Sequence, residues 1–224
     1  MNILALDTAA SLCAACVYDS RSRAEKGRHV LDLGRGHAEH VMAVIAGALD
    51  EAGLTYSDLA AVAVAVGPGS FTGLRVGVSA ARGLALALEI PAIGVTTLEA
   101  LAAEAREAYP GRPILSVIGR SEPFPIAGFD IAGALADGPR LALLEEAARL
   151  AEAGTVLAGD AAETVAQAAG GRFDFGPQRA TADILFYARI AASRPASGEK
   201  PRPLYLRKPD AKPQSGFALP LRRQ

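Results

Sequence analysis

The segment best suited to chemistry is a glycine-rich turn at residues 67–73 (GPGSFTG), between an apolar run at residues 60–66 and a helical pattern. A turn from a buried strand into a helix leaves backbone N–H groups at the positive helix end, which suits a phosphate. The turn is not a Walker A loop, because Leu74 stands where that loop needs a lysine. The alternative to a phosphate site is a tight structural turn.

Histidines and cysteines form two clusters whose spacing suggests metal or redox chemistry. His37 and His40 could share one helical face with Glu39 nearby, but the chain has only one further histidine, so a polar helix start is the favoured interpretation. Cys13 and Cys16 match CxxC, yet on a strand positions i and i+3 point to opposite faces. We therefore expect two small buried hydrophobic residues there, and no metal ligand set in the chain.

The helix predicted over residues 73–89 carries a row of small residues at i, i+4 spacing. Glycine inside a helix costs about 1 kcal/mol relative to alanine, so close packing should offset that cost. The row packs either on the chain's own sheet or on another subunit. Its members are Gly73, Gly77, Ala81 and Ala85, with Leu74 and Val78 beside them.

Composition limits the function classes. Half of the 224 residues are apolar and only 5% are aromatic, so the core must consist of Ala, Val, Leu and Ile, as in parallel strands covered by helices. The net charge of −1 gives no overall attraction to nucleic acid, so any RNA contact must be local or supplied by a partner.

Two cysteines in a chain of this length form no disulfide framework, and the start of the sequence does not resemble a signal peptide. Arg75 and Arg82 interrupt the longest apolar helix, so we predict no membrane span. A reducing cytoplasm is the expected location.

The elements that position these residues alternate between strands and helices, first in an α/β unit of residues 1–110. YPGRP at 109–113 marks the boundary to a smaller unit at 111–194, whose last helix is expected to pack back on the first, and a basic, proline-rich tail follows at 195–224. Strands are predicted at 3–7, 13–19, 28–33, 60–66, 91–96, 114–118, 125–130 and 155–158. Helices are predicted at 37–52, 73–89, 97–108, 140–152, 161–169 and 182–193.

Four segments carry a resemblance to a known family: LALDTAA near the start, RGHAEHVMAVIAGALDEAG at 35–53, GPGSFTGLRVGVSAARGLALALEIPAIGVTTLEAL from residue 67, and PLYLRKPDAKPQ at 203–214. They resemble the TsaB (YeaZ) family, which belongs to the tRNA threonylcarbamoyladenosine biosynthesis proteins. The match is good over the first hundred residues and poor over 114–180. Gly119 stands where many relatives carry an aspartate, which puts the role of that aspartate in doubt here.

The resemblance implies a two-lobed actin/Hsp70/sugar-kinase (ASKHA) fold and a non-catalytic subunit of a complex that modifies adenosine 37 of tRNA. It implies a TsaD-like catalytic subunit and a TsaE-like ATPase as partners, with tRNA bound through the complex. It leaves two alternatives for the isolated chain, a homodimer and a monomer. ATP or ADP is expected only at the joint with these partners. The partner-binding residues implied on the two first-domain helices are His37, Val41, Val44, Ile45, Gly73, Leu74, Gly77, Val78, Ala81 and Ala85.

Asp7 ends the first predicted strand, where members of the sugar-kinase superfamily hold an acid near phosphates and Mg²⁺. The favoured interpretation is an aspartate that caps the adjacent turn. An ATP-dependent phosphotransferase is the alternative function, and a peptidase is a third, although Ser70 lacks the GxSxG spacing. The candidate nucleotide or phosphate ligands are Asp7, Gly67, Gly69, Ser70 and Thr72.

Overall fold

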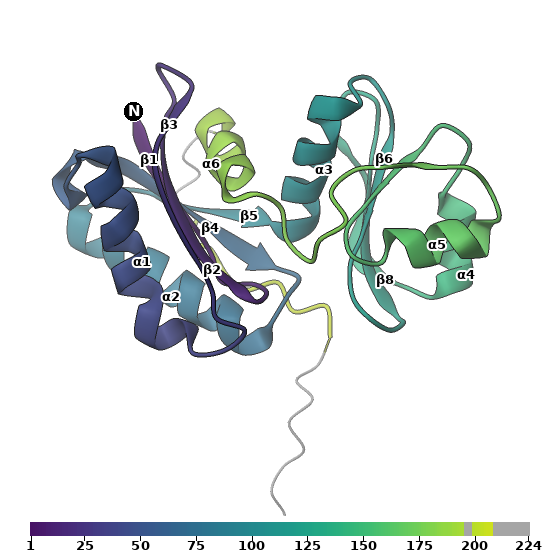
Figure 1. The fold of residues 1–224 in the computed structure, drawn as a ribbon, viewed down its shortest axis with the longest axis horizontal. Coiled ribbons are helices and arrows are strands. Elements are labelled where there is room, and N and C mark those ends of the chain that lie inside the picture. The colour runs from purple at the N-terminus through teal and green to yellow at the C-terminus, as the bar shows by residue number, and fades with distance from the viewer. Residues whose placement is uncertain (195–198, 208–224) are drawn as a thin grey trace, which may run out of the picture.

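The computed structural model describes residues 1–194 and 199–207, and it contains two five-stranded sheets with helices packed on them (Figure 1). The first sheet has the order β3-β2-β1-β4-β5, in which β1, β4 and β5 are parallel and β1, β2 and β3 are successive antiparallel neighbours. Its strands are β1 (Asn2–Asp7), β2 (Leu12–Asp19), β3 (Ala24–Asp32), β4 (Leu59–Gly67) and β5 (Ala92–Thr96).

The first sheet is buried on both faces, which explains the fully apolar β4. On one face Leu4 and Leu6 join the core formed with α1 (His37–Ala52) and α2 (Phe71–Leu88). On the other face Ile3 and Ala5 join the core formed with α3 (Thr97–Ala108) and α6 (Ile184–Ser193). The two predicted α/β units are thus joined through α6, which returns to the first sheet.

Helix ends follow the local sequence signals. Gly53 ends α1 with a left-handed φ of 65° and donates its N–H to the carbonyls of Asp50 and Leu49. The Thr96 hydroxyl accepts the N–H of Glu99 at 3.2 Å and caps α3. Ser70 caps α2, which therefore begins at Phe71 rather than at residue 73. A short 3-10 helix (Tyr56–Asp58) precedes β4.

The second sheet has the order β10-β9-β6-β7-β8. Two of its strands were not predicted, and the predicted helix at 140–152 is wrong at both ends. Gly138 and Pro139 resemble a turn but lie within β8, an edge strand that tolerates proline, while β10 has only two residues. The elements are β6 (Ile114–Val117), β7 (Phe124–Phe129), β8 (Leu135–Ala142), α4 (Leu144–Leu150), β9 (Val156–Ala158), α5 (Ala162–Ala169) and β10 (Asp174–Phe175).

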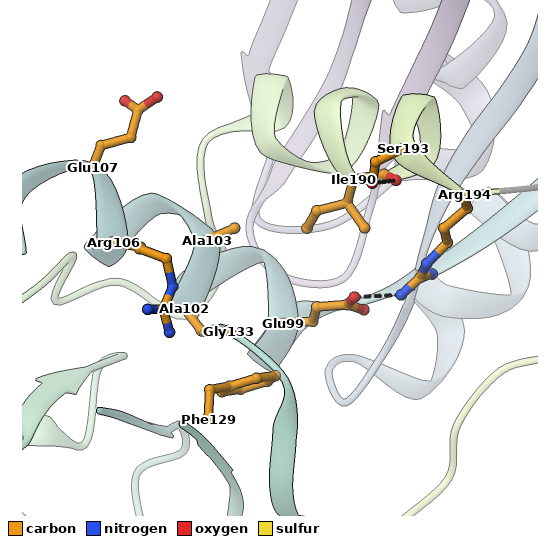
Figure 2. Close-up of a pocket in the computed structure, with 10 residues that line it drawn as sticks. All are labelled: Glu99, Ala102, Ala103, Arg106, Glu107, Phe129, Gly133, Ile190, Ser193 and Arg194. Carbon is orange, nitrogen blue, oxygen red and sulfur yellow. Dashed lines mark hydrogen bonds and ion pairs between the residues drawn. The ribbon is translucent and has the colours of Figure 1, made fainter. Parts of the chain in front are cut away.

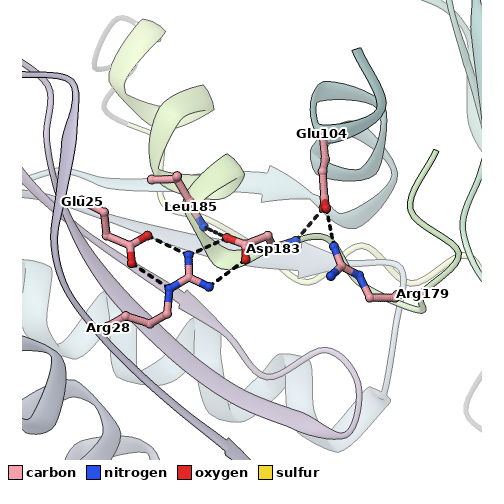
Figure 3. A network of polar contacts seen from close by, with 6 residues as sticks. All are labelled: Glu25, Arg28, Glu104, Arg179, Asp183 and Leu185. Carbon is pink, nitrogen blue, oxygen red and sulfur yellow. Dashed lines mark hydrogen bonds and ion pairs between the residues drawn. The ribbon is translucent and has the colours of Figure 1, made fainter. Parts of the chain in front are cut away.

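An ion-pair network fixes the chain where it returns from the second sheet to α6 (Figure 3). The guanidinium of Arg28 on β3 lies between Glu25 and Asp183, with N–O distances of 2.7 Å to each. Asp183 also caps α6 by accepting the N–H of Leu185, and its own N–H donates to Glu104 of α3. The segment before α6 is therefore held over the end of β1, where Asp7 lies.

A cavity of about 410 Å³ lies between α3 and α6 (Figure 2). Arg194 pairs with Glu99 across it, and Arg106 donates to the carbonyls of Asp130 and Ile131 at 2.8 Å. The contacts of Arg106 and Arg194 at the rim of this cavity thus connect α3 with the turn after β7 and with the end of α6.

Candidate functional site

A cleft of about 680 Å³ between the two sheets is the main candidate site in the described part of the chain. Turns from both sheets border it: residues 9–11 after β1, 68–71 before α2, 118–120 after β6, and Asp160 after β9. Residues 204–207 line it as well. The cleft therefore brings together the predicted phosphate turn and parts of the second sheet that the sequence did not connect with it.

The glycine-rich turn is packed tightly against the hairpin that follows β1. Gly67 has a φ of 104°, which only glycine adopts readily. The N–H of Ser70 donates to the carbonyl of Ala9 at 2.7 Å, and a Cβ at Gly69 would lie 2.5 Å from that oxygen. A Cβ at Gly73 would come closer than 3.0 Å to the carbonyl oxygen of Thr8. These glycines thus permit close backbone packing, and one donor expected for a phosphate is already bonded.

Asp7 lies beneath this hairpin, with only 2% of its surface exposed. Its Oδ1 accepts the N–H of Ala9 at 2.8 Å, which is the turn-capping contact that the favoured interpretation predicted. Burial raises the pKa of the carboxyl to about 6, although the bond from Ala9 opposes this rise. Asp7 borders a separate cavity of about 240 Å³ beside Arg28 and Thr181 rather than the large cleft. The candidate phosphate ligands are therefore divided: Ser70 and Gly69 line the cleft and Asp7 does not.

The ten residues implied for partner binding are all buried within the chain. Gly77 illustrates the reason, because a Cβ there would lie 2.5 Å from the Thr8 hydroxyl oxygen and 3.5 Å from a methyl of Val64 in β4. The small-residue row therefore packs on the chain's own sheet, which is one of the two alternatives that the sequence left open. Partner binding by these two helices stays a prediction. The buried set is His37, Val41, Val44, Ile45, Gly73, Leu74, Gly77, Val78, Ala81 and Ala85.

The outward face of α1 and α2 carries exposed apolar side chains among charged ones such as Glu39, Arg75 and Arg82. Met42 is 48% exposed and Leu86 is 77% exposed. Ala43 on α1 is also exposed, and Val76 and Ala80 on α2 are half-buried. A partner that docks on these helices meets this outward face, so the face can be tested without disturbing the core.

The structure places the histidine and cysteine side chains as follows: some are buried in the core and some are exposed to solvent. His37 Nε2 lies 3.2 Å from the carbonyl oxygen of Leu12, while Glu39 and His40 are exposed. Cys13 and Cys16 face opposite cores of the first sheet, as the strand geometry predicted. Burial raises the pKa of the Cys13 thiol to about 11, so the thiol is protonated at neutral pH. Within residues 1–194 and 199–207, no three His, Cys, Asp or Glu residues are grouped so that they could hold a metal ion.

α2 is long and apolar enough to span a membrane by length and composition alone, and it is the one such helix within the described residues. It packs on the first sheet through its buried side, as a core helix does.

Sequence reasoning missed the charged and aromatic side chains that meet at the cleft. Asp160 accepts the N–H of Gly119 at 2.7 Å, so an acid from another loop lies beside Gly119. Arg75 lies 3.9 Å over the ring of Phe71 and donates to the hydroxyl of Tyr205 at 3.1 Å. Arg75 is thus engaged by aromatic rings. The PLYLR segment was the sequence signal for this docking.

Comparisons with known proteins agree with this fold. A family model described as "TsaD: tRNA N6-adenosine threonylcarbamoyltransferase" matches residues 31–194. The chain is 37% identical over 102 residues to "tRNA threonylcarbamoyladenosine biosynthesis protein TsaB" of Escherichia coli, which is 46% of this chain and 43% of the relative. It is 37% identical over 107 residues to the TsaB of Bacillus subtilis, which is 47% and 45% of the two chains. The chain thus matches about half the length of these curated relatives.

Solved structures extend the likeness to the second sheet. "YeaZ from Pseudomonas aeruginosa" superposes with a TM-score of 0.73 at 25% identity, over 92% of this chain and 99% of that one. A ROK hexokinase from Thermus thermophilus superposes with a TM-score of 0.51 at 17% identity, over 85% and 98% of the two chains. The second likeness shows the fold alone, which is the two-domain ASKHA fold that the resemblance implied.

Proposed function

Because the chain belongs to the TsaD family of tRNA N6-adenosine threonylcarbamoyltransferase proteins, we propose that it serves threonylcarbamoyladenosine formation in the cytoplasm as a non-catalytic subunit. In this proposal it supports a TsaD-like catalytic subunit that modifies N6 of adenosine 37, with a TsaE-like ATPase and tRNA in the same complex. The similarity to the TsaB relatives supports the pathway.

One observation carries the non-catalytic role. If this chain were an ASKHA enzyme, its activity would depend on Asp7 and the turn at 67–73. Here Asp7 and the turn are bonded to the hairpin that follows β1. The Asp7 carboxyl caps the turn at Ala9, and Ala9 in turn accepts the N–H of Ser70. The Asp7 carboxyl is 2% exposed and does not line the 680 Å³ cleft, so it is poorly placed to hold a Mg²⁺ ion there.

A reconstituted assay with the catalytic subunit, the ATPase and tRNA tests the proposal. We expect no threonylcarbamoyl transfer by this chain alone and loss of transfer when this chain is withheld, measured by nucleoside analysis of adenosine 37. Modified tRNA from the isolated chain, or full modification without it, would contradict the role of an obligatory non-catalytic subunit.

The outward face of α1 and α2 is the proposed docking surface for the catalytic subunit, and for a second copy when the chain is alone. Leu86→Glu places a charge on this face without touching the core, since Leu86 is 77% exposed. We expect at least about tenfold weaker binding of the catalytic subunit, as for a hot-spot side chain. Titration calorimetry measures the affinity, and light scattering measures the homodimer.

Ile131→Glu is the matched control, because Ile131 is 65% exposed in the turn between β7 and β8. Native affinity of the Leu86→Glu variant, or an equal loss in both variants, would show that the helix pair is not the docking surface.

The phosphotransferase alternative rests on the 680 Å³ cleft. We expect the isolated chain to bind ATP with a Kd on the order of 0.1 mM or weaker, with any ATP or ADP site completed by charges from a partner. Micromolar binding with turnover, abolished by Asp7→Ala, would favour the phosphotransferase. The peptidase alternative is weaker still, because the Ser70 hydroxyl accepts the N–H of Gly73 as a helix cap.

A further inference from the structure

Residues 199–207 form an extended segment that joins the two sheets on one side of the cleft (Figure 1). The N–H of Leu204 donates to the carbonyl of Val66 at the end of β4, at 2.7 Å. The guanidinium of Arg207 donates to the carbonyls of Ser121, at 2.6 Å, and Pro123 in the turn between β6 and β7. The segment is therefore fixed against both parts of the protein.

Cations along this segment lack the carboxylate partners that six arginines elsewhere have. Lys200 and Arg202 are exposed on the segment, and Arg120 is exposed on the facing turn of the second sheet. Within the described ranges none of these three forms an ion pair, and Arg207 is bonded only to carbonyls, which leave its charge intact. The ion-paired arginines elsewhere are Arg28, Arg112, Arg140, Arg179, Arg189 and Arg194.

Nearby acids do not cancel this charge. Asp160 at the cleft and Glu199 beside Lys200 are two acids against four cations, which are Arg120, Lys200, Arg202 and Arg207. The local balance is therefore positive, although the whole chain has a net charge of −1.

An aromatic ring lies among these cations. Tyr205 is 42% exposed, and its ring is stacked on Phe71 with 4.7 Å between centroids. The bond from Arg75 to its hydroxyl fixes the ring in this position. A fixed, partly exposed ring beside unpaired cations suits an unstacked base and its phosphates, because aromatic stacking and phosphate neutralisation are the two main terms in single-strand binding.

We propose that a basic strip, consisting of Arg120, Lys200, Arg202, Tyr205 and Arg207, binds the phosphate backbone of RNA, with a base stacked on Tyr205. The eight residues from 200 to 207 span about 20 Å when extended, which is long enough to follow several phosphates. This inference rests on the proposed function, because we take the RNA to be the tRNA that the complex modifies. Arg120, Tyr205 and Arg207 border the cleft, and Lys200 and Arg202 border the neighbouring pocket on the same segment. Four cations beside an exposed ring favour RNA over an acidic protein surface.

The test measures the anisotropy of labelled tRNA with the full chain, alone and bound to the catalytic subunit, at several salt concentrations. The variants Arg120→Gln and Arg202→Gln are each expected to weaken binding severalfold. Each should also lower the slope of log K against log salt by about 0.7–0.9. The double variant is expected to bind at least about tenfold more weakly, and Tyr205→Leu should weaken binding with the slope unchanged.

The controls are Arg23→Gln and Arg172→Gln, two exposed arginines outside the strip. Equal losses of affinity in the strip and control variants would overturn the inference, and so would unchanged tRNA affinity of the double variant. Absence of tRNA binding both by the chain alone and by its complex with the catalytic subunit would overturn it as well. Strip variants that no longer bind the catalytic subunit but still bind tRNA would also overturn the inference, because the strip would then be a protein interface.

The reconstituted assay separates this inference from the proposed function. If modification requires the chain but the double variant binds tRNA normally, the inference fails and the proposed function stands. If modification proceeds without the chain, the proposed function fails, whereas loss of tRNA binding in the strip variants would still support an RNA-binding strip.

Discussion

Gly73→Ala is expected to lower the free energy of unfolding by about 1–3 kcal/mol, although alanine is normally the better helix former. A Cβ at this position would clash with the carbonyl oxygen of Thr8. That oxygen belongs to the backbone of the hairpin after β1, and the Thr8 hydroxyl is also bonded to the carbonyl of Gly73 at 2.7 Å. Relief therefore requires α2 and the hairpin to move apart.

Gly83→Ala is the matched control, because Gly83 lies in the same helix with nothing within 4 Å of a Cβ. It is expected to raise the free energy of unfolding by up to about 1 kcal/mol through helix propensity. Urea denaturation of both variants measures the difference. Equal stability of the two would show that the hairpin and α2 are not in close contact in solution.

The same contact shows what the sequence could and could not predict. The i, i+4 row at Gly73 and Gly77 correctly predicted that a neighbour approaches α2 closely. Periodicity identifies the face of a helix but not the element that covers it, so the chain's own hairpin and another subunit were equally compatible with the pattern. The structure assigns the row to the hairpin and to β4.

Elements with strong local signals were predicted well. The helix that ends at Gly53 and the helix that begins at Thr96 have the predicted bounds, because caps are decided within a few residues. β8 was missed, since Gly138 and Pro139 interrupt its pattern and only pairing with β7 makes it a strand. Tertiary contacts, rather than propensity, determine such elements.

The cleft depends on contacts between residues far apart in the sequence. Arg120 of the second unit and Arg207 of the tail both border it. Asp7 is covered by the segment before α6, which lies more than 170 residues later. No local pattern contains that information. The assignment of Asp7 as a cap and not a cleft ligand therefore needed the structure, even though the turn-capping contact was anticipated.

Asp7→Asn is expected to stabilise the protein by about 2–3 kcal/mol at pH 7.5. Burial raises the pKa of Asp7 from its usual 3.8 to about 6 in the folded protein, so the folded state binds a proton more tightly than the unfolded chain. Stability is therefore lost as the pH rises from about 4 through 6, and the loss is complete above pH 6. Asparagine is neutral at every pH and its Oδ1 can still accept the N–H of Ala9, so the variant avoids this loss.

The measurement is the free energy of unfolding of both proteins between pH 4 and 7.5, with a gain that shrinks toward zero at pH 4. Asp58→Asn is a control of opposite sign. Asp58 is exposed and its pKa is lowered by bonds from the N–H and hydroxyl of Thr55, so its substitution should cost stability near neutral pH. A variant at Asp7 that is less stable near neutral pH, with a loss that fades toward pH 4, would indicate a charged carboxylate held by a bound cation, as the phosphotransferase alternative requires. A stabilised Asp7→Asn protein that still supports tRNA modification would instead place Asp7 in the architecture of the hairpin, outside any Mg²⁺ chemistry.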